Sequence, residues 1–435
     1  MAYLYTNNHQ TNYSDYDDSK SEHKAKYGLP KNILFCQSCV ISNQRPSSAV
    51  EFKNLKNAIK ETIHLNENNV CDACNYALLK KKKIDWIERE KELGDLCDKY
   101  RRNDGRYDCV VPGSGGKDSI YASHILKYKY NMNPVTVTWA PHIYTDWGWK
   151  NFQAWINAGF DNILHTPNGK VHRLLTRLAV EELFHPFQPF MLGQKNIAPK
   201  IAINYEIPLV FYGENEAEYG NKTSANNTAE QNNNYFTIKE KTDIYLSGVN
   251  TSDLISDFGL SKNDIEPYLP IDLNILHEKK IDVQHLGYYL NWHPQECYYY
   301  SVENSDFKAA PERSAGTYSK YNSIDDKMDD LHYYTLFIKY GIGRATYDAS
   351  QEIRNEEIDR NEGKALIKKF DGEFPERFIN EIFEYLSIEG LDHIFQQSKM
   401  DLDYFKNLCD KYRSPHIWKR DNDKWLLRKA VWHKD

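Results

Sequence analysis

The sequence predicts an α/β protein: a doubly wound parallel sheet, with a small cysteine-rich module before it and a mostly helical region after it. From residue 107 onward, short apolar segments alternate with helix-periodic ones, and this β–α–β–α order favours parallel strands joined by helices. Two CxxC pairs mark the preceding module. Charged, helix-periodic sequence dominates from about residue 325.

Length and charge set the broad class of protein. The 435 residues are enough for two or three domains with their own cores. The net charge of −7 argues against a broad nucleic-acid-binding face. No apolar run reaches the roughly 18 residues of a membrane helix, and the first residues lack an apolar signal core. We therefore expect a cytoplasmic protein that neither spans a membrane nor binds nucleic acid.

Changes in composition divide the chain into five parts. The polar residues 1–30 are predicted to be a disordered tail. Residues 31–80 hold the cysteine pairs, and residues 81–106 form a charged helical connector. The α/β domain is expected at 107–300. The remaining 301–435 are expected to be mostly helical and to bind a substrate or partner.

Within the α/β domain, strands and helices are expected in strict alternation. The predicted strands are 107–111, 135–139, 162–165 and 208–212, with a further strand or strand-to-loop transition at 285–292. The predicted helices are 147–158, 170–184 and 194–205. The Asn-rich stretch at about 221–238 is interpreted as a mobile surface insertion.

The two cysteine pairs are predicted to bind one metal ion. Cys36 and Cys39 form one CxxC, and Cys71 and Cys74 form the other. Two such turns can make a tetrahedral S₄ site that suits Zn²⁺, and a closed Cys₄ site would be structural because it offers no open position. Buried reduced cysteines, an iron–sulfur cluster and thiol redox chemistry are the alternatives.

The stretch VPGSGGKDS at 111–119 follows a predicted strand and opens a helix. Its three glycines let the backbone turn tightly and bring N–H groups close to an anion, and the helix N-terminus adds partial positive charge. Lys117 can neutralise charge, whereas Asp118 is expected to meet a backbone N–H or Mg²⁺. The alternative is a glycine-rich turn without a ligand.

The SGGxDS pattern resembles the loop of the PP-loop ATP pyrophosphatases, which have an adenine nucleotide alpha hydrolase-like fold. The resemblance implies that this loop binds the pyrophosphate end of ATP and leaves the α-phosphate open to attack by a substrate oxygen. Trp139, at the end of another strand, is expected to border the adenine. The predicted ATP-binding residues are therefore Gly113, Ser114, Gly115, Gly116, Lys117, Asp118, Ser119 and Trp139.

A second acidic motif, GENEAEYG, follows the predicted strand at 208–212. Because ligands bind at the carboxyl ends of parallel strands, Glu214 and Glu218 are expected near the loop. Together with Lys117 and Asp118 they form the predicted catalytic set, and Asp118 and Glu214 are the candidate Mg²⁺ ligands. A solvated acidic loop is the alternative for this motif.

The whole layout resembles the N-acetyl sugar amidotransferases of bacterial surface-glycan pathways, which make acetamidino derivatives of pseudaminic, legionaminic or diacetamido-uronic acids. The resemblance covers roughly 33–400 and rests on FCQSCVISNQRP, CDAC, IDWIEREKELGDLCDKYR, YDCVVPGSGGKDS, GENEAEYG and EGKALIKKFDGEFPERF. The Pro112-Gly113 pair before the loop departs from the usual small apolar residue, and the polar N-terminus and Asn-rich insertion also differ.

The resemblance implies an ATP-dependent amidotransferase that needs ATP, Mg²⁺ and a structural Zn²⁺. An N-acetyl oxygen of a sugar or nucleotide sugar would attack ATP, release pyrophosphate and form an O-adenylyl imidate. Ammonia would then displace AMP and leave an acetamidine. Residue 2 is Ala and no GxCxG elbow surrounds a cysteine, so we expect a separate glutaminase–cyclase pair to supply the ammonia.

The sugar is expected to be held partly by the C-terminal region. Arg344, Arg354 and Lys364 suit the phosphate or carboxylate of an acidic nucleotide sugar, and His142 could also face the substrate, although solvated helix faces and a polar loop explain these residues equally well. The rival functions are a tRNA-thiolating PP-loop enzyme, for which Cys297 is the candidate sulfur carrier, and a non-catalytic zinc and nucleotide scaffold.

Overall fold

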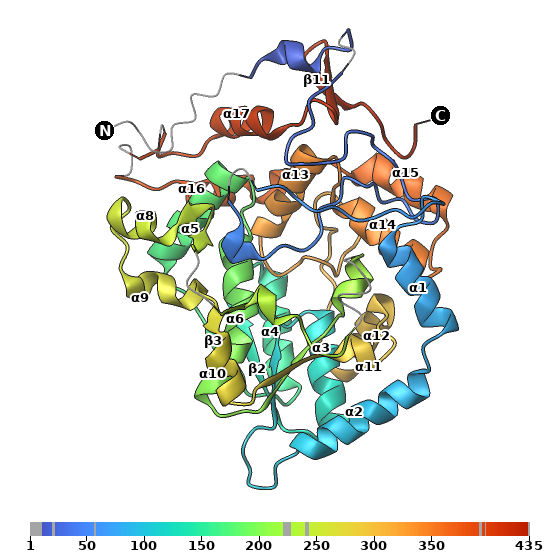
Figure 1. Cartoon of the computed structure of the whole chain (residues 1–435), viewed down its shortest axis with the longest axis vertical. Helices are drawn as coiled ribbons and strands as arrows, with labels where there is room; N and C mark the ends of the chain where they lie inside the picture. Colours follow the sequence, from blue (N-terminus) through green and yellow to red (C-terminus); the bar gives the residue numbers. More distant parts are fainter. Residues whose placement is uncertain are drawn as a thin grey trace.

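Five parallel strands form the central sheet, in the order β3-β2-β1-β4-β9 (Figure 1). The computed structural model describes residues 11–19, 22–55, 58–220, 228–239, 243–390, 394–395 and 397–433. The strands are β1 (Cys109–Pro112), β2 (Pro134–Trp139), β3 (Asn162–His165), β4 (Leu209–Tyr212) and β9 (Asp282–His285). The predicted parallel sheet is confirmed, and β9 ends where the expected further strand was to begin.

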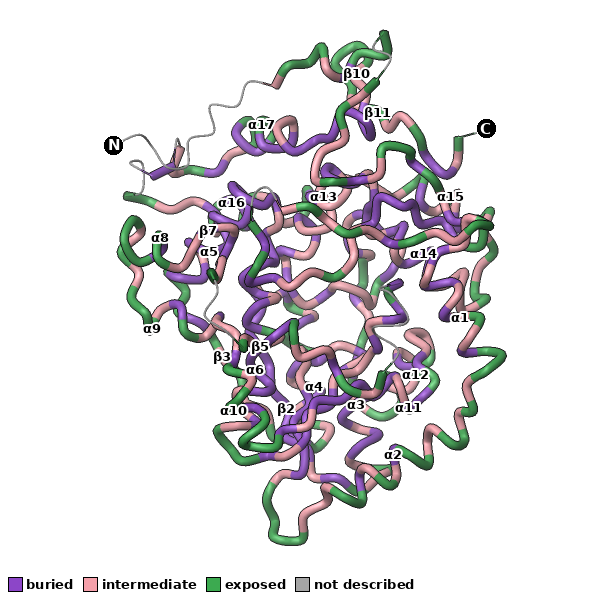
Figure 2. Tube along the Cα trace, viewed as in Figure 1, coloured by how far each residue is buried: buried purple, intermediate pink, exposed green. Residues whose placement is uncertain are grey.

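Alternating side chains bury both faces of the sheet, so it is doubly wound. Val110 and Val210 pack in one core with α5 (Gly169–Leu183) and α6 (Gln188–Asn204). Val111 and Phe211 pack in a second core on the other side. That side is covered by α2 (Trp86–Tyr100), α3 (Lys117–His124) and α11 (Leu286–Tyr289), and α4 (Asp146–Asn157) packs beside α3. The strand β2 is buried along its whole length (Figure 2), whereas β3 at the edge of the sheet is only partly buried.

The strand order places a crevice beside the end of β1. β1 pairs with β2 on one side and β4 on the other, so the connections after β1 and β4 leave the sheet in opposite directions. Ligands bind in open α/β sheets at such a switch point, outside the carboxyl ends of the strands. The loop at 113–116 and the segment at 213–220 therefore lie next to each other.

The C-terminal region is helical, as predicted, but it shares a core with the sheet. Ile382 and Leu386 belong to the same apolar cluster as Val110. The region comprises α13 (Met328–Tyr340), α14 (Arg344–Arg354), α15 (Arg360–Phe370), α16 (Ile379–Leu386), α17 (Leu402–Tyr412) and the antiparallel pair β10 (Trp418–Asp421) and β11 (Lys424–Leu427).

Smaller elements connect these parts. They are α1 (Asp72–Lys82), β5 (Thr237–Ile238), β6 (Tyr245–Leu246), β7 (Val249–Asn250), α8 (Thr251–Ser256), α9 (Lys262–Ile265), β8 (Ile271–Asp272), α10 (Leu273–Glu278) and α12 (Pro294–Asn304). Part of the Asn-rich insertion is ordered, since β5 pairs with β8 and the Gln231 amide donates to Val283 at 2.9 Å. Residues 221–227 lie outside the described residues. Along the described chain, no helix combines the length and apolarity needed to cross a bilayer.

The N-terminal segment differs from the predicted disordered tail. Tyr16 is 2% exposed, and its hydroxyl donates to the Arg413 carbonyl at 3.0 Å. Arg428 donates in turn to the Tyr16 carbonyl at 2.8 Å. The segment lies against β11 (Figure 1) because its aromatic side chains find apolar partners that a polar composition does not reveal. Residues 1–10 of the predicted tail lie outside the described residues.

A fully buried arginine ties the C-terminal region to the sheet. Arg177 in α5 pairs with Glu181 at 2.8 Å. Its other nitrogens donate to the carbonyls of Leu386 and Ser398 at 2.9 Å and of Gln397 at 2.7 Å. Arg177→Met should lower the free energy of unfolding by about 3–5 kcal/mol, because it leaves the Glu181 carboxylate buried without its counter-ion. Urea unfolding measures this.

Arg173→Met is the matched control for this substitution. Arg173 is only partly buried, and it donates to the carbonyls of Glu384, Tyr385 and Ser387 in the same region. Its loss should lower the free energy of unfolding less, because water can reach the carbonyls that a partly buried guanidinium leaves. Equal losses of unfolding free energy in both variants would contradict the assignment of Arg177 as the main link between the C-terminal region and the sheet.

Candidate functional site

The four paired cysteines converge on one point. The Sγ atoms of Cys36 and Cys74 lie 3.8 Å apart, those of Cys39 and Cys71 also 3.8 Å, and all four lie within 4.8 Å of one another. Zn–S bonds of about 2.3 Å in a tetrahedron place sulfurs about 3.8 Å apart. The backbone amides of Cys39 and Cys71 point at the Cys36 sulfur. The cluster can therefore bind structural zinc.

The cysteine module is fastened to the rest of the site at two points. Arg360, at the start of α15, donates to the carbonyls of Cys36 and Cys39, each at 3.0 Å. Lys80, on the helix that begins beside Cys71, pairs with Glu218 at 2.5 Å. A folded module therefore positions both the C-terminal helices and the segment after β4.

The turn after β1 has no room for a side chain at two of its three glycines, Gly113 and Gly115. A Cβ on Gly113 would lie 2.1 Å from the Cβ of Ser119. Gly115 has a φ of +85°, and its Cβ would lie 2.6 Å from the Cα of Phe152. The chain is thus folded tightly onto α3 and α4, and the first turn of α3 faces the crevice with its free backbone amides.

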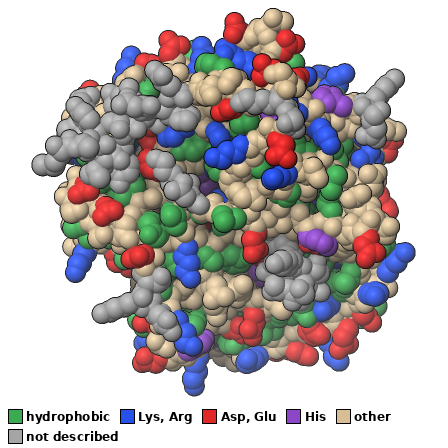
Figure 3. Space-filling model, turned by 45° about the horizontal axis from the view of Figure 1, so that its top comes forward, with side chains coloured by type: hydrophobic (Ala, Val, Ile, Leu, Met, Phe, Trp, Pro, Cys, Tyr) green, Lys and Arg blue, Asp and Glu red, His purple; other side chains and the backbone are tan. Residues whose placement is uncertain are grey.

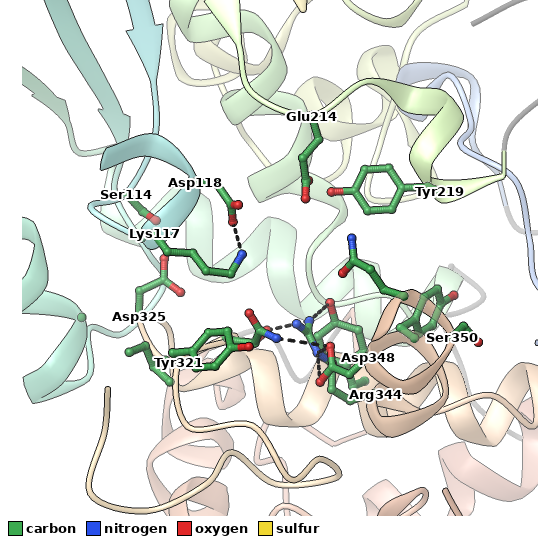
Figure 4. A pocket seen from close by; sticks show the side chains of 18 of the residues that line it. Ser114, Lys117, Asp118, Glu214, Tyr219, Tyr321, Asp325, Arg344, Asp348 and Ser350 are labelled. Atoms are coloured by element: carbon green, nitrogen blue, oxygen red, sulfur yellow. Dashed lines mark hydrogen bonds and ion pairs between the residues drawn. The ribbon is translucent and has the colours of Figure 1, made fainter. Parts of the chain in front are cut away.

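Two carboxylates crowd one lysine beside this turn. Lys117 Nζ lies 2.5 Å from Asp118 Oδ2, and both side chains face Glu214 (Figure 4). Burial and the charge of Asp118 raise the pKa of Glu214 to about 8. Burial alone would lower the pKa of Lys117, but the charges of Asp118 and Glu214 raise it. The excess of carboxylate over lysine suits a divalent cation.

Two cavities meet at the loop. The first, of about 290 Å³, lies between the loop and α13–α14, and we call it the C-terminal cavity. The second, of about 360 Å³, lies over the ends of β1, β4 and β9, and we call it the sheet-edge cavity. All of residues 113–119 line one or both. The wall that the cavities share is made by Ser114, Gly116, Asp118, Glu214 and Tyr219.

Several predicted site residues lie at these cavities and others do not. Arg344 and Arg354 line the C-terminal cavity opposite the loop. Glu218 lines neither cavity, because its carboxylate is held by Lys80. The hydroxyl of Ser119 donates to the Gly116 carbonyl at 2.9 Å, so it completes the turn.

The remaining predicted residues lie away from both cavities. Trp139 is 3% exposed and packs on Gly193. The His142 side chain is fully buried, with Nδ1 2.7 Å from Asp326. Lys364 on α15 also lines neither cavity. Trp139 ends β2 and His142 follows it, and both side chains are buried in the core. A linear sequence does not distinguish the core side of a strand end from the ligand side.

The sequence reasoning missed residues in the segment that runs from the end of α12 through α14. Tyr321, Asp325 and Asp348 line the C-terminal cavity (Figure 4), and so does Tyr333. Asp325 accepts a hydrogen bond from Ser114 of the loop, while burial raises the pKa of Asp325. The sequence did contain one signal for them. The run SIDDKMDD at 323–330 is rich in aspartate although apolar residues interrupt it.

Similarity to known proteins is found mainly in the segment that forms the wall of the C-terminal cavity opposite the loop. Residues 315–431 match the C-terminal domain of WbpG-like LPS biosynthesis proteins. This segment supplies Tyr321, Asp325, Arg344 and Arg354 to the cavity. The match supports a protein of glycan biosynthesis, suggests an enzyme and fits a sugar-modifying role.

A second similarity is short. The uncharacterized protein MJ1599 of Methanocaldococcus jannaschii is 31% identical over 78 residues, which is 18% of this chain. The aligned part spans 27% of the length of that relative.

Removing one cysteine tests the metal site. We expect one zinc per chain, and Cys71→Ser should lose the metal and reduce the soluble yield more than the affinity for ATP. Elemental analysis measures the zinc content of the purified protein. Cys409→Ser is the control, since Cys409 is also buried but lies outside the module. Iron with a visible absorption band would refute the zinc assignment.

The pKa of Glu214 predicts a pH dependence of stability. A carboxyl whose pKa is raised to about 8 in the folded chain stabilises the fold when protonated, and this is lost as pH rises through that value. The melting temperature of Glu214→Gln should therefore change less than that of wild type between about pH 6 and about pH 9. Thermal melting measures this, with exposed Glu312→Gln as control. Parallel profiles for wild type and Glu214→Gln would contradict it.

Proposed function

We propose that this chain is an ATP-dependent amidotransferase of the PP-loop type, which converts an N-acetyl group of a sugar or nucleotide sugar to an acetamidino group. The observation that carries the proposal is the composition of the C-terminal cavity. A phosphate-type loop forms one wall, and a segment similar to a lipopolysaccharide biosynthesis domain forms the opposite wall. A nucleotide and a sugar can thus meet at the residues that both cavities share.

The loop would bind the pyrophosphate end of ATP and leave the α-phosphate at the shared wall. The amides of the turn and of the α3 N-terminus suit phosphate oxygens, and Lys117 offsets their charge. Asp118 and Glu214 would hold Mg²⁺, which supplies charge neutralisation when bound. The sheet-edge cavity, beside the topological switch point, suits the rest of the nucleotide.

The acceptor would react through its amide oxygen. That oxygen bonds to the α-phosphorus and pyrophosphate leaves, which gives an O-adenylyl imidate. Ammonia then adds to the imidate carbon, a proton is lost, and AMP departs with the former amide oxygen. The chain's contribution is to hold both reactants in line and to exclude water from the imidate.

Ammonia would come from a separate glutaminase. All eight cysteines are buried. None of them lines the C-terminal or the sheet-edge cavity, so a nucleophilic cysteine for glutamine hydrolysis is lacking there. A glutaminase–cyclase pair, as in the proteins that the sequence resembles, is the expected partner.

The same observation disfavours tRNA thiolation. Cys297 is 1% exposed, and burial raises the pKa of its thiol well above the usual range, so it is poorly suited to carry sulfur. On the face in Figure 3, basic and acidic side chains of the described residues are interspersed and form no basic stripe.

The test is product analysis with ATP, Mg²⁺, ammonium and a panel of N-acetylated sugars, nucleotide sugars and nonulosonic acids. We expect AMP and pyrophosphate to form only with an acceptor, and the acceptor mass to change by replacement of O with NH. Lys117→Gln should lower the rate by about 100-fold or more, because charge on the departing pyrophosphate is left uncompensated. ADP as product, or activity only with tRNA, would contradict the proposal.

A further inference from the structure

Four cationic side chains line the C-terminal cavity, but only two of them have carboxylate partners. Lys117 pairs with Asp118, and Arg344 Nε lies 3.0 Å from Asp348. Within the described residues, Arg45 and Arg354 form no ion pair with a carboxylate. These two arginines therefore bring to the cavity wall positive charge that no carboxylate binds directly, although the cysteine cluster lies close enough to raise the pKa of Arg354.

Arg45 is the more unusual of the two. It is 7% exposed, and its Nη1 is buried without a hydrogen-bond partner. Its guanidinium lies 5.7 Å from the centre of the Tyr347 ring. Burial lowers the pKa of Arg45; among its charged neighbours Tyr347 raises that pKa and Arg354 lowers it. A buried guanidinium with a free donor and a like-charged neighbour is costly unless a ligand completes it.

Neighbouring groups on α14 extend this basic subsite. Ser350 is 2% exposed, and its hydroxyl is also buried without a partner. Among the residues that the structure describes, Arg354 donates to one backbone oxygen, that of Glu218, at 3.3 Å. Figure 4 shows Ser350 on the opposite side of the cavity from Ser114 and Lys117. The unpartnered hydroxyl of Ser350 is thus separated from the phosphate loop.

We propose that Arg45 and Arg354 together bind an oxyanion of the acceptor, a carboxylate or a phosphate, at the end of the C-terminal cavity remote from the loop. The identity of that anion as part of an acceptor sugar rests on the proposed function. Arginine suits both groups because its planar fork donates two parallel hydrogen bonds. Arg344, already neutralised by Asp348, is assigned to the cavity wall and not to the anion.

The subsite gives the cysteine module a role in recognition. Arg45 lies in that module, whereas Arg354 ends α14, and Arg360 joins the two parts through the carbonyls of Cys36 and Cys39. The anion therefore contacts the cysteine module and the C-terminal helices at the same time. Charge at one end of the acceptor would fix which of its groups reaches the loop at the other end.

Binding without ATP tests this subsite separately from turnover. Isothermal titration would compare N-acetylneuraminic acid, which carries a carboxylate, UDP-N-acetylglucosamine, which carries phosphates, and neutral N-acetylglucosamine. At least one acidic probe should bind wild type more tightly than the neutral sugar. Arg45→Gln and Arg354→Gln should each weaken that probe by about tenfold or more, and Arg45→Lys should weaken it less.

Controls separate loss of the subsite from loss of the fold. Lys53→Gln, an exposed cation of the same module, should leave binding unchanged. ATP affinity should stay within about twofold in Arg45→Gln, and its melting temperature should not fall, because the removed charge had no carboxylate partner. Loss of the carboxylate probe identifies a carboxylate subsite, and loss of the UDP-sugar identifies a phosphate subsite.

Three results would overturn the subsite: no acidic probe binds, acidic and neutral sugars bind equally, or Arg45→Gln leaves the acidic probe unaffected. Absence of turnover together with Arg45-dependent binding would instead count against the proposed reaction and leave the subsite in place.

Discussion

The turn that follows β1 is the constraint on which the site depends. Gly113 and Gly115 have no room for a side chain, since Ser119 and the backbone of Phe152 occupy the space. This contact folds the loop onto α3 and α4 and points the amides of the α3 N-terminus at the crevice. It also sets Lys117 and Asp118 against the segment after β4. A looser turn would separate Lys117 and Asp118 from Glu214.

Around this turn the chain gathers three parts into one site. The sheet supplies the loop and Glu214, the C-terminal region supplies the wall with Arg344 and Arg354, and the cysteine module supplies Arg45. Buried polar contacts hold the parts together, notably those of Arg177 and Arg360. The similarity of residues 315–431 to a lipopolysaccharide biosynthesis domain thus concerns a segment that closes the cavity.

Much of the fold could be predicted from sequence because its signals are local. Apolar strands, helical periodicity, the glycine-rich turn and the CxxC pairs each act over a few residues, and the four predicted strands and the cysteine cluster are observed. What failed depends on long-range packing. Tyr16 is ordered by contacts with the C-terminal region, and His142 is buried against Asp326, which lies 184 positions away in the chain. Arg45 joins the site through the tertiary fold alone.

The most direct test of the account is the fate of the amide oxygen. An acceptor labelled with ¹⁸O in its N-acetyl carbonyl would be converted with ATP, Mg²⁺ and ammonium, and the AMP analysed by mass spectrometry. If the acceptor oxygen attacks the α-phosphorus across the shared wall, the label appears in AMP. Label in pyrophosphate or in water, with unlabelled AMP, would contradict attack at that atom.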